Sequence, residues 1–178
     1  MTANPPVAIS AFTAREIEDR AGELGELLTA CVLDGASIGF ILPFAVAEGE
    51  AFWLNKVLPS VRSGGATLLV AEAEGRIAGT VLLDHDTMPN QPHRAEARKL
   101  LVHPDFRRRS IARALMAELE GLAGRMGRSL ITLDTRTGDK AEPLYASLGY
   151  QIAGIIPGYC RDTHEDRLDP TTIMYKAL

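Results

Sequence analysis

The sequence predicts an α/β fold with a mixed, mostly antiparallel twisted sheet, a central parallel strand pair and flanking helices. Three observations support this prediction. Strand-like and helical runs alternate along the chain, the turn Glu74-Gly75 joins two strand-like runs as a hairpin, and residues 94–135 fit one strand–helix–strand unit. A chain of 178 residues with 46% hydrophobic residues is expected to form one domain, residues 1–178, with its own core.

The first third of the chain predicts a strand and two helices. Residues 7–12 form a short strand-like run, and Thr13-Ala14-Arg15-Glu16 fits a capping box that starts a helix. The apolar stripe of this helix recurs at three- and four-residue steps as far as Cys31, which we therefore place in the core. Glycines and a proline interrupt residues 35–44, which favours a shaped loop, and residues 47–61 are expected to form the second helix.

The rest of the chain supplies the sheet. Residues 67–72 and 77–83 are rich in Val, Leu and Ile and predict an antiparallel hairpin. The strand 94–102 is followed by an amphipathic helix, 111–126, and by the strand 130–133, so a right-handed crossover should make these two strands parallel. The remaining elements are expected to be a helix at 140–148 and strands at 151–156 and 172–176.

Composition disfavours several classes of function. The chain carries 19 Lys and Arg against 23 Asp and Glu, a net charge of −4, so bulk attraction to nucleic acid or to anionic membranes is not expected. The four histidines are scattered, and Cys31 and Cys160 form no ligand or disulfide pattern, so no metal is expected. The sequence shows no signal-peptide pattern and no apolar run long enough for a membrane span. These features predict a cytoplasmic protein, either a monomer or a homodimer.

The most informative segment is a basic turn between a strand and a helix. Arg107, Arg108 and Arg109 stand where the strand 94–102 passes into the helix 111–126. Free N–H groups and the helix dipole already make this helix end positive, so further cations are favourable only if an anion binds there. A solvated arginine cluster is the simpler alternative, but the pattern favours a polyphosphate.

Two motifs resemble those of the Gcn5-related N-acetyltransferases (GNAT). Val102-x-Pro104-x-x-Arg107-x-x-Ser110-Ile111-Ala112 is similar to the pyrophosphate loop of that family, and Ala141-x-x-Leu144-Tyr145-x-x-Leu148-Gly149-Tyr150 is similar to its A-x-x-[LF]-Y-x-x-x-G-[FY] segment. The resemblance implies a GNAT-like fold and acetyl-CoA as co-substrate, with loop amides on the pyrophosphate and strand backbone on the pantetheine arm. The cofactor-binding residues that it implies are Leu100, Leu101, Val102, Arg107, Arg108, Arg109, Ser110, Ile111 and Ala112.

Two positions depart from the family pattern. Ser110 stands where Gly is usual, and its Cβ can crowd a backbone that approaches a phosphate, although its hydroxyl could instead donate a hydrogen bond to that phosphate. Gly138 stands where Asn is frequent. More narrowly, four segments resemble the tabtoxin-resistance branch of the family, which implies acetylation of a small amine. These segments are residues 34–40, 94–104, 133–138 and 154–159.

Transfer of an acetyl group to an amine needs a base for the ammonium proton and an acid for the departing thiolate. Asp134 is a candidate base because it follows a strand at the crevice where open α/β sheets bind ligands. Glu96 is a candidate by resemblance to the strand-borne base of the family. Their structural alternatives are an ion pair of Glu96 with Arg94 or Arg98, and a cap on the next turn for Asp134. Tyr145 is the candidate acid, since a phenol keeps its proton at neutral pH, and its alternative is a core aromatic.

The leading hypothesis is an acetyl-CoA-dependent N-acetyltransferase in which a small-molecule amine attacks directly. The acceptor could be a toxin, an antibiotic or an amino-acid-like compound. Covalent catalysis is less attractive, because Cys31 lies on an apolar stripe and Cys160 has no activating histidine nearby in sequence. The alternatives are a non-catalytic acyl-CoA-binding sensor and an acetyltransferase that acts on a protein amine. The acidic residues 162–166 are expected to form a solvated loop or to attract a cationic acceptor.

Overall fold

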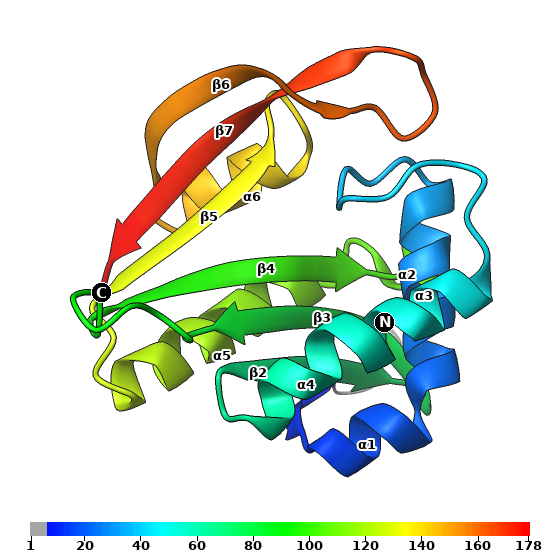
Figure 1. Ribbon diagram of the computed structural model, residues 1–178, viewed down its shortest axis with the longest axis horizontal. Helices are drawn as coiled ribbons and strands as arrows, with labels where there is room; N and C mark the ends of the chain where they lie inside the picture. The colour runs from blue at the N-terminus through cyan, green and yellow to red at the C-terminus, as the bar shows by residue number, and fades with distance from the viewer. Residues whose placement is uncertain (1–6) are drawn as a thin grey trace, which may run out of the picture.

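The computed structural model describes residues 7–178, which form a seven-stranded sheet with helices on both faces (Figure 1). The strand order is β1-β2-β3-β4-β5-β7-β6, and all neighbouring pairs are antiparallel except β4 and β5, which are parallel. The predicted fold class is confirmed. The strands are β1 (Ala8–Phe12), β2 (Ala66–Ala73), β3 (Arg76–Asp84), β4 (Arg94–Val102), β5 (Leu130–Arg136), β6 (Gln151–Arg161) and β7 (Leu168–Ala177).

Helices on the two faces of the sheet enclose two apolar cores. On one face Leu115 and Leu119 of α5 pack with Ile131 of β5, and on the other Leu24 of α2 packs with Leu68 of β2. In Figure 1, α5 and α6 lie behind the sheet and α1 to α4 lie in front of it. The helices are α1 (Ala14–Asp19), α2 (Ala21–Leu33), α3 (Val46–Phe52), the π turn η1 (Trp53–Val57), α4 (Leu58–Arg62), the 3₁₀ turn η2 (Pro104–Phe106), α5 (Ile111–Arg125) and α6 (Ala141–Ser147).

Both helices expected before the first hairpin are interrupted. The first breaks at Arg20, whose φ of −118° separates α1 from α2, and whose guanidinium pairs with Glu72 of β2. The second passes through the π turn η1 just before Pro59, which has no N–H to donate to the preceding turn. No helix among residues 7–178 is long and apolar enough to cross a membrane.

The parallel strands β4 and β5 pair over only three residues and then diverge. Their register joins Arg94–Glu96 to Leu130–Thr132, and beyond this point Figure 1 shows the two strands separating. A bulge interrupts β4 here, since Thr80 pairs with Leu101 but Leu82 pairs with Arg98. Lys99, within the bulge, has a left-handed φ of 53°. The divergence opens a gap in the middle of the sheet.

Candidate active site

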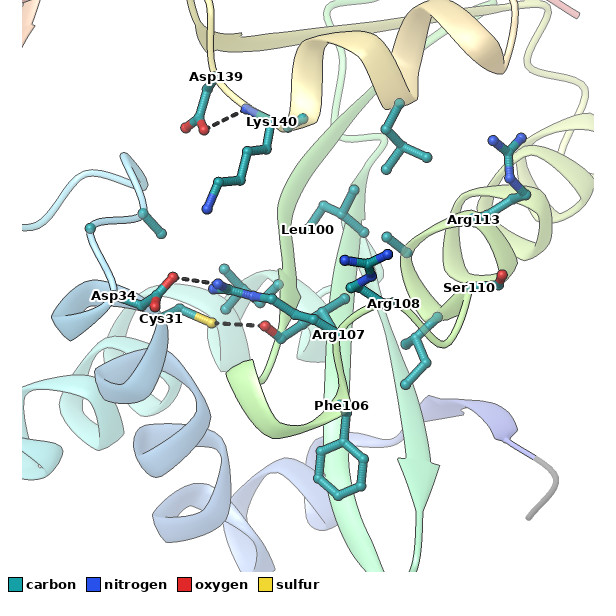
Figure 2. A pocket seen from close by; sticks show the side chains of 18 of the residues that line it. Cys31, Asp34, Leu100, Phe106, Arg107, Arg108, Ser110, Arg113, Asp139 and Lys140 are labelled. Carbon is teal, nitrogen blue, oxygen red and sulfur yellow. Dashed lines mark hydrogen bonds and ion pairs between the residues drawn. The ribbon is translucent and has the colours of Figure 1, made fainter. Parts of the chain in front are cut away.

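A cavity of about 810 Å³ lies beside the diverging end of β4 (Figure 2). Its walls come from the end of β4, the turn before α5, the end of α2 and the start of α6. Its volume is in the range of small-molecule sites in proteins. The gap in the sheet therefore leads into a space that can hold a sizeable ligand.

The turn from β4 into α5 supplies unpaired backbone N–H groups. Arg108 and Ser110 adopt left-handed φ angles of 61° and 60°, and Ser110, the N-cap of α5, makes no side-chain capping bond. The first helical bond runs from Ala114 N–H to the Ser110 carbonyl, and the N–H groups of residues 111–113 have no acceptor within residues 7–178. The first turn of α5 holds no acidic residue. This arrangement is typical of an anion-binding site.

Cationic side chains surround these N–H groups. Arg107 pairs with Asp34 at the end of α2. Arg108 lines the cavity and makes no ion pair within the described part of the chain. Lys140 reaches toward the turn from the N-terminus of α6, on the opposite wall (Figure 2), and is likewise unpaired among residues 7–178. These charges suit a ligand with several phosphate oxygens.

Cys31 lies at the base of the same cavity. It is 2% exposed, and its Sγ donates a hydrogen bond to the Val102 carbonyl at 3.6 Å. Burial raises the pKa of the Cys31 thiol to about 11. The thiol is therefore protonated at neutral pH and is a poor nucleophile.

The two candidate carboxylates lie on the opposite face of the sheet from α5. Ala95, Ala97 and Leu133 point into the α5-side core, and side chains alternate along a strand, so Glu96 and Asp134 point the other way. Glu96 stands at the last paired position before β4 and β5 diverge. The carboxylates thus lie on the α2 side of the sheet, whereas the cavity at the end of the gap is walled by elements of both faces, α2 and α5.

The Glu96 carboxylate makes no hydrogen bond or ion pair within residues 7–178. Arg98 pairs instead with Asp84 at 3.0 Å, and within the described residues Arg94 forms no ion pair, so the structural alternative for Glu96 is not realised. Burial raises the pKa of the Glu96 carboxyl above its usual value, and the carboxylates of Asp84 and Asp134 raise it further. A carboxylate in this state accepts a proton more readily than a solvated one.

Tyr145 of α6 is 7% exposed and packs edge-on against Tyr150, with ring centroids 5.8 Å apart. Burial raises the pKa of its phenol well above the usual value, and the carboxylates of Asp134 and Asp139 raise it further. Asp134 itself accepts a hydrogen bond from Thr171 Oγ1 at 3.3 Å, rather than capping the next turn. The Tyr145 hydroxyl is thus held in its protonated form, and it bonds to no group within residues 7–178.

Lys99 fixes the loop between α2 and α3 to the bulge of β4. Its Nζ donates to the Ile38 carbonyl at 2.6 Å and lies over the rings of Phe40 and Phe52 at 5.5 and 5.3 Å. Burial lowers the pKa of Lys99 to about 8. The loop is thereby held beside the gap in the sheet, on the face that carries Glu96.

The loop between β6 and β7 closes against the same α2–α3 loop. Leu42 N–H donates to the Thr163 carbonyl at 3.1 Å, and Thr163 Oγ1 donates to the Ala36 carbonyl at 3.1 Å. Arg136 at the end of β5 adds a third link, a bond to the Gly35 carbonyl at 3.3 Å. Two loops far apart in the sequence therefore meet across the end of the gap.

Asp162 holds the β6–β7 loop in shape. It is 7% exposed and accepts bonds from the N–H groups of His164 and Glu165 at 2.9 and 2.8 Å, and from Arg136 at 3.1 Å. These backbone bonds lower the pKa of Asp162 to about 2. The expectation of a solvated loop at 162–166 is therefore wrong for Asp162, because its carboxylate is buried against N–H groups and arginines.

Residues 64–152 match a family model described as an acetyltransferase (GNAT) domain. The chain belongs to the GNAT acetyltransferase family. The matched half of the chain runs from just before β2 to the start of β6 and includes the basic turn, both candidate carboxylates and α6. The protein is therefore an N-acetyltransferase, and members of this family act on amine acceptors.

Solved structures share the fold of this acetyltransferase. That of yncA from Salmonella typhimurium, which contains its cofactor acetyl-CoA, is 19% identical, with 97% of this chain and 94% of that chain covered and a TM-score of 0.76. The ribosomal-protein-alanine N-acetyltransferase from Brucella melitensis is 22% identical over 96% and 99% of the two chains, with a TM-score of 0.77. An N-acetyltransferase from Staphylococcus aureus is 13% identical over 97% of this chain and 98% of that chain, with a TM-score of 0.79.

Most of the residues predicted to bind the cofactor line the cavity of this acetyltransferase. Arg109 does not: its guanidinium turns away, pairs with Glu74 at 2.6 Å and stacks on the Phe106 ring. Glu96, Asp134 and Tyr145 also lie outside the cavity wall, around the gap. The predicted residues that line the cavity are Leu100, Leu101, Val102, Arg107, Arg108, Ser110, Ile111 and Ala112.

Sequence reasoning missed the parts of the acetyltransferase site that come from other elements. Asp34 and Cys31 at the end of α2 and Lys140 before α6 carry no motif that points to phosphate. Lys99 had a usable signal, a lysine within an otherwise apolar strand end, but only the bulge shows which way it points. Asp162 could not be distinguished from the other acidic residues of its segment, because its partner Arg136 is distant in sequence.

Proposed function

We propose that this chain is an acetyl-CoA-dependent N-acetyltransferase whose acceptor is a small-molecule amine that attacks directly. The observation that carries the proposal is the gap between β4 and β5, with a cavity at its end that holds Arg108 and Lys140, and with Glu96 beside it, all three without an ion pair within residues 7–178. The resemblance of four segments to the tabtoxin-resistance branch supports the same class of acceptor.

The residues around the cavity fit acetyl-CoA. The free N–H groups of residues 111–113, with Arg108 and Lys140, would hold its phosphates, and the backbone of Leu100–Val102 would hold the pantetheine arm. Bound acetyl-CoA supplies a thioester carbonyl as the acetyl donor. Ser110 has a left-handed backbone, and its side-chain oxygen accepts no capping bond from the first turn of α5, so its hydroxyl is free to donate to a phosphate.

Glu96 is the proposed general base. Its carboxylate takes the proton of the acceptor ammonium, directly or through a water molecule, and burial gives it a raised pKa that suits this task. Asp134, on the same face, adds negative charge that favours a cationic acceptor near the gap. Tyr145 holds its proton at Oη and is the proposed acid. Cys31 stays protonated, which supports direct attack over a covalent intermediate.

The closure of two loops over the gap favours a small acceptor. The bonds of Thr163 to Leu42 and Ala36, and of Arg136 to Gly35, hold the two loops together at the end of the gap. A protein amine would have to approach Glu96 past these two loops. The hydrogen bonds between the loops therefore favour a free amine over a folded protein as acceptor.

Release of the CoA thiol from acetyl-CoA, measured over a panel of amines, tests the proposal. The panel comprises β-lactam dipeptide mimics, aminoglycosides, polyamines and amino acids, and titration calorimetry measures acetyl-CoA binding in parallel. Thiol release that depends on one class of amine and is lost in Glu96→Gln supports the proposal. Binding of acetyl-CoA without turnover of any amine would support the alternative of a non-catalytic acyl-CoA-binding sensor. Turnover of protein amines alone would support a protein acceptor instead of a small molecule. Absence of acetyl-CoA binding would overturn the proposal.

A further inference from the structure

β6 is an edge strand whose apolar side chains are exposed on both faces. It ends the sheet order after β7, and Ile152, Ile155 and Ile156 are 54%, 54% and 44% exposed. Large apolar side chains gather here more than elsewhere in the described chain, because Tyr159 and Leu168 beside them are also more than half exposed. A contiguous apolar patch of this kind marks an interaction surface.

The two faces of β6 can be told apart by the partners of its residues in β7. Ile152 pairs with Met174, which lies in the α5-side core, so Ile152 points to the face of α6. Ile155 pairs with Thr172, whose Oγ1 contacts Glu142 of α6 at 3.4 Å, so it points the same way. Ile156, the next residue, points to the opposite face. An occupant that buries these isoleucines must therefore cover the edge and both faces of the strand.

The first half of β6 lacks the usual protection of an edge strand. Edge strands commonly carry lysine, proline or a bulge that prevents pairing. Pro157, Gly158 and the wide bulge between Ile156 and Cys160 protect the second half. Residues 151–156 hold only a single-residue bulge near Gly154 and no charged side chain at all. This half offers free backbone N–H and C=O groups flanked by apolar side chains.

We propose that residues 151–156 pair with the same residues of a second copy of this chain, in antiparallel register about a twofold axis perpendicular to the sheet. Such an axis keeps each face of the sheet on its own side, so Ile152 of each copy meets Ile155 of the other beside α6, and Ile156 of each copy lies opposite Gln151 of the other on the other face. The absence of charge from Gln151 to Cys160 favours a copy of itself over a charged partner, because no like charges meet across the axis. The pairing extends the sheet across two protomers.

Sedimentation equilibrium of the full chain over a wide concentration range tests this proposal without any activity measurement, so its outcome is separate from that of the proposed acetyl transfer. Wild-type protein should have twice the 19.2 kDa of one chain, and the double variant Ile152→Lys and Ile155→Lys should sediment as a monomer. Ile156→Lys should weaken the dimer from the other face. Met88→Lys, at a 68% exposed site in the β3–β4 loop, is the matched control and should remain dimeric.

Hydrogen exchange separates this dimer from any other. Amides of residues 151–156 should exchange more slowly in the wild-type dimer than in the lysine variants, with unchanged exchange in β2 and β3. Wild-type protein that stays monomeric at every concentration would overturn the proposal, even if it bound lipid vesicles or an extended peptide through β6. A dimer that persists in both lysine variants, with fast exchange at 151–156, would overturn it as well.

Discussion

The two sides of the gap between β4 and β5, which we call the cavity face and the Glu96 face, are built in different ways. The cavity face is made mostly from one continuous segment, the end of β4, the turn and the start of α5, which supplies its anion-binding N–H groups. The Glu96 face is assembled from distant parts of the chain, which include the α2–α3 loop, Asp134 of β5 and the loop that begins at Asp162. A continuous segment gives a site that backbone geometry maintains. An assembled site depends on individual long-range contacts.

This difference indicates which substitutions should affect binding of acetyl-CoA and which should affect turnover. On the cavity face backbone N–H groups carry much of the binding, so one side chain contributes only part of it. On the Glu96 face one carboxylate, which has no partner in the part of the chain that the structure describes, carries the proposed proton transfer, so its loss should be severe. Substitutions on each face should therefore separate binding of acetyl-CoA from turnover.

The largest effect is expected from Glu96→Gln. We expect kcat to fall by about 10²- to 10⁴-fold, the usual contribution of a general base, while acetyl-CoA binding stays unchanged. Wild-type activity should decline as the pH falls through the pKa of Glu96, which lies above the ordinary value of 4.5, because the protonated carboxyl cannot accept a proton. The variant should lose this acidic limb from its pH–rate profile.

Asp84→Asn is the matched control for Glu96, because Asp84 lies opposite Glu96 in β3 and is already paired with Arg98. Its activity should stay within a few-fold of wild type, and the acidic limb should move to lower pH, since one carboxylate that raises the pKa of Glu96 is gone. Equal losses in the two variants would contradict a specific role for Glu96.

On the cavity face, Arg108→Met and Arg109→Met compare neighbouring arginines. Arg108 lines the cavity without an ion pair in the described part of the chain, whereas Arg109 pairs with Glu74. Loss of a charge-assisted bond to phosphate at Arg108 should weaken acetyl-CoA binding about ten- to hundredfold by calorimetry. Arg109→Met should change it little. An equal loss of acetyl-CoA affinity in both variants would mean that the overall positive charge of the turn, rather than a single contact from Arg108, holds the phosphates.

Most residues of the cavity face could be predicted from the sequence, because the motifs that mark them are local. The strand-to-helix turn, the three arginines and the Ala141 to Tyr150 segment lie within short stretches, where spacing determines which residues share a turn. Even so, Arg109 could not be told from Arg108, because the left-handed φ of Arg108 sends successive side chains to different sides. A left-handed conformation at an arginine cannot be predicted from the residue type.

The Glu96 face was predicted only in outline, because its geometry depends on strand divergence and on loops that meet in space. Glu96 was predicted by resemblance to the strand-borne base of the family, but the bulge that directs Lys99 toward Phe40 is not visible in the sequence. The acidic run 162–166 was expected to be solvated since its arginine partner, Arg136, lies 26 residues earlier. Whether such a carboxylate is solvated or buried depends on contacts between residues that are far apart in the sequence.

A smaller effect is expected from Asp162→Asn, which loosens the β6–β7 loop on the Glu96 face. The pKa of Asp162 is lowered from 3.8 to about 2, so its ionised form stabilises the fold above pH 3.8, and this stabilisation is lost as the pH falls toward 2. The variant should therefore melt earlier than wild type at neutral pH, with a difference that shrinks on acidification. The KM for the amine should rise several-fold.

Asp166→Asn is the control in the same loop, since its side chain is 94% exposed and its one ion pair within residues 7–178 is with the exposed Arg161. It should leave both the melting temperature and the KM near the wild-type values. A pH-independent difference between Asp162→Asn and wild type would contradict the role assigned to the buried carboxylate.

The smallest effect, and the finest test of the cavity face, is expected from Ser110→Gly. Ser110 has a left-handed φ of 60° and makes no capping bond, a conformation that costs a residue with a Cβ about 1 kcal/mol and costs glycine little. The variant should therefore be more stable than wild type, by up to that amount in chemical unfolding. Ser63→Gly, at the ordinary φ of −76°, should lose stability, because there glycine adds freedom to the unfolded chain and removes the bond from Ser63 Oγ to the Ser60 carbonyl at 3.1 Å. Acetyl-CoA affinity then separates two roles of the Ser110 side chain. Tighter binding in Ser110→Gly would mean that the Cβ crowds the phosphates, and weaker binding despite the relieved backbone would mean that the hydroxyl donates to them.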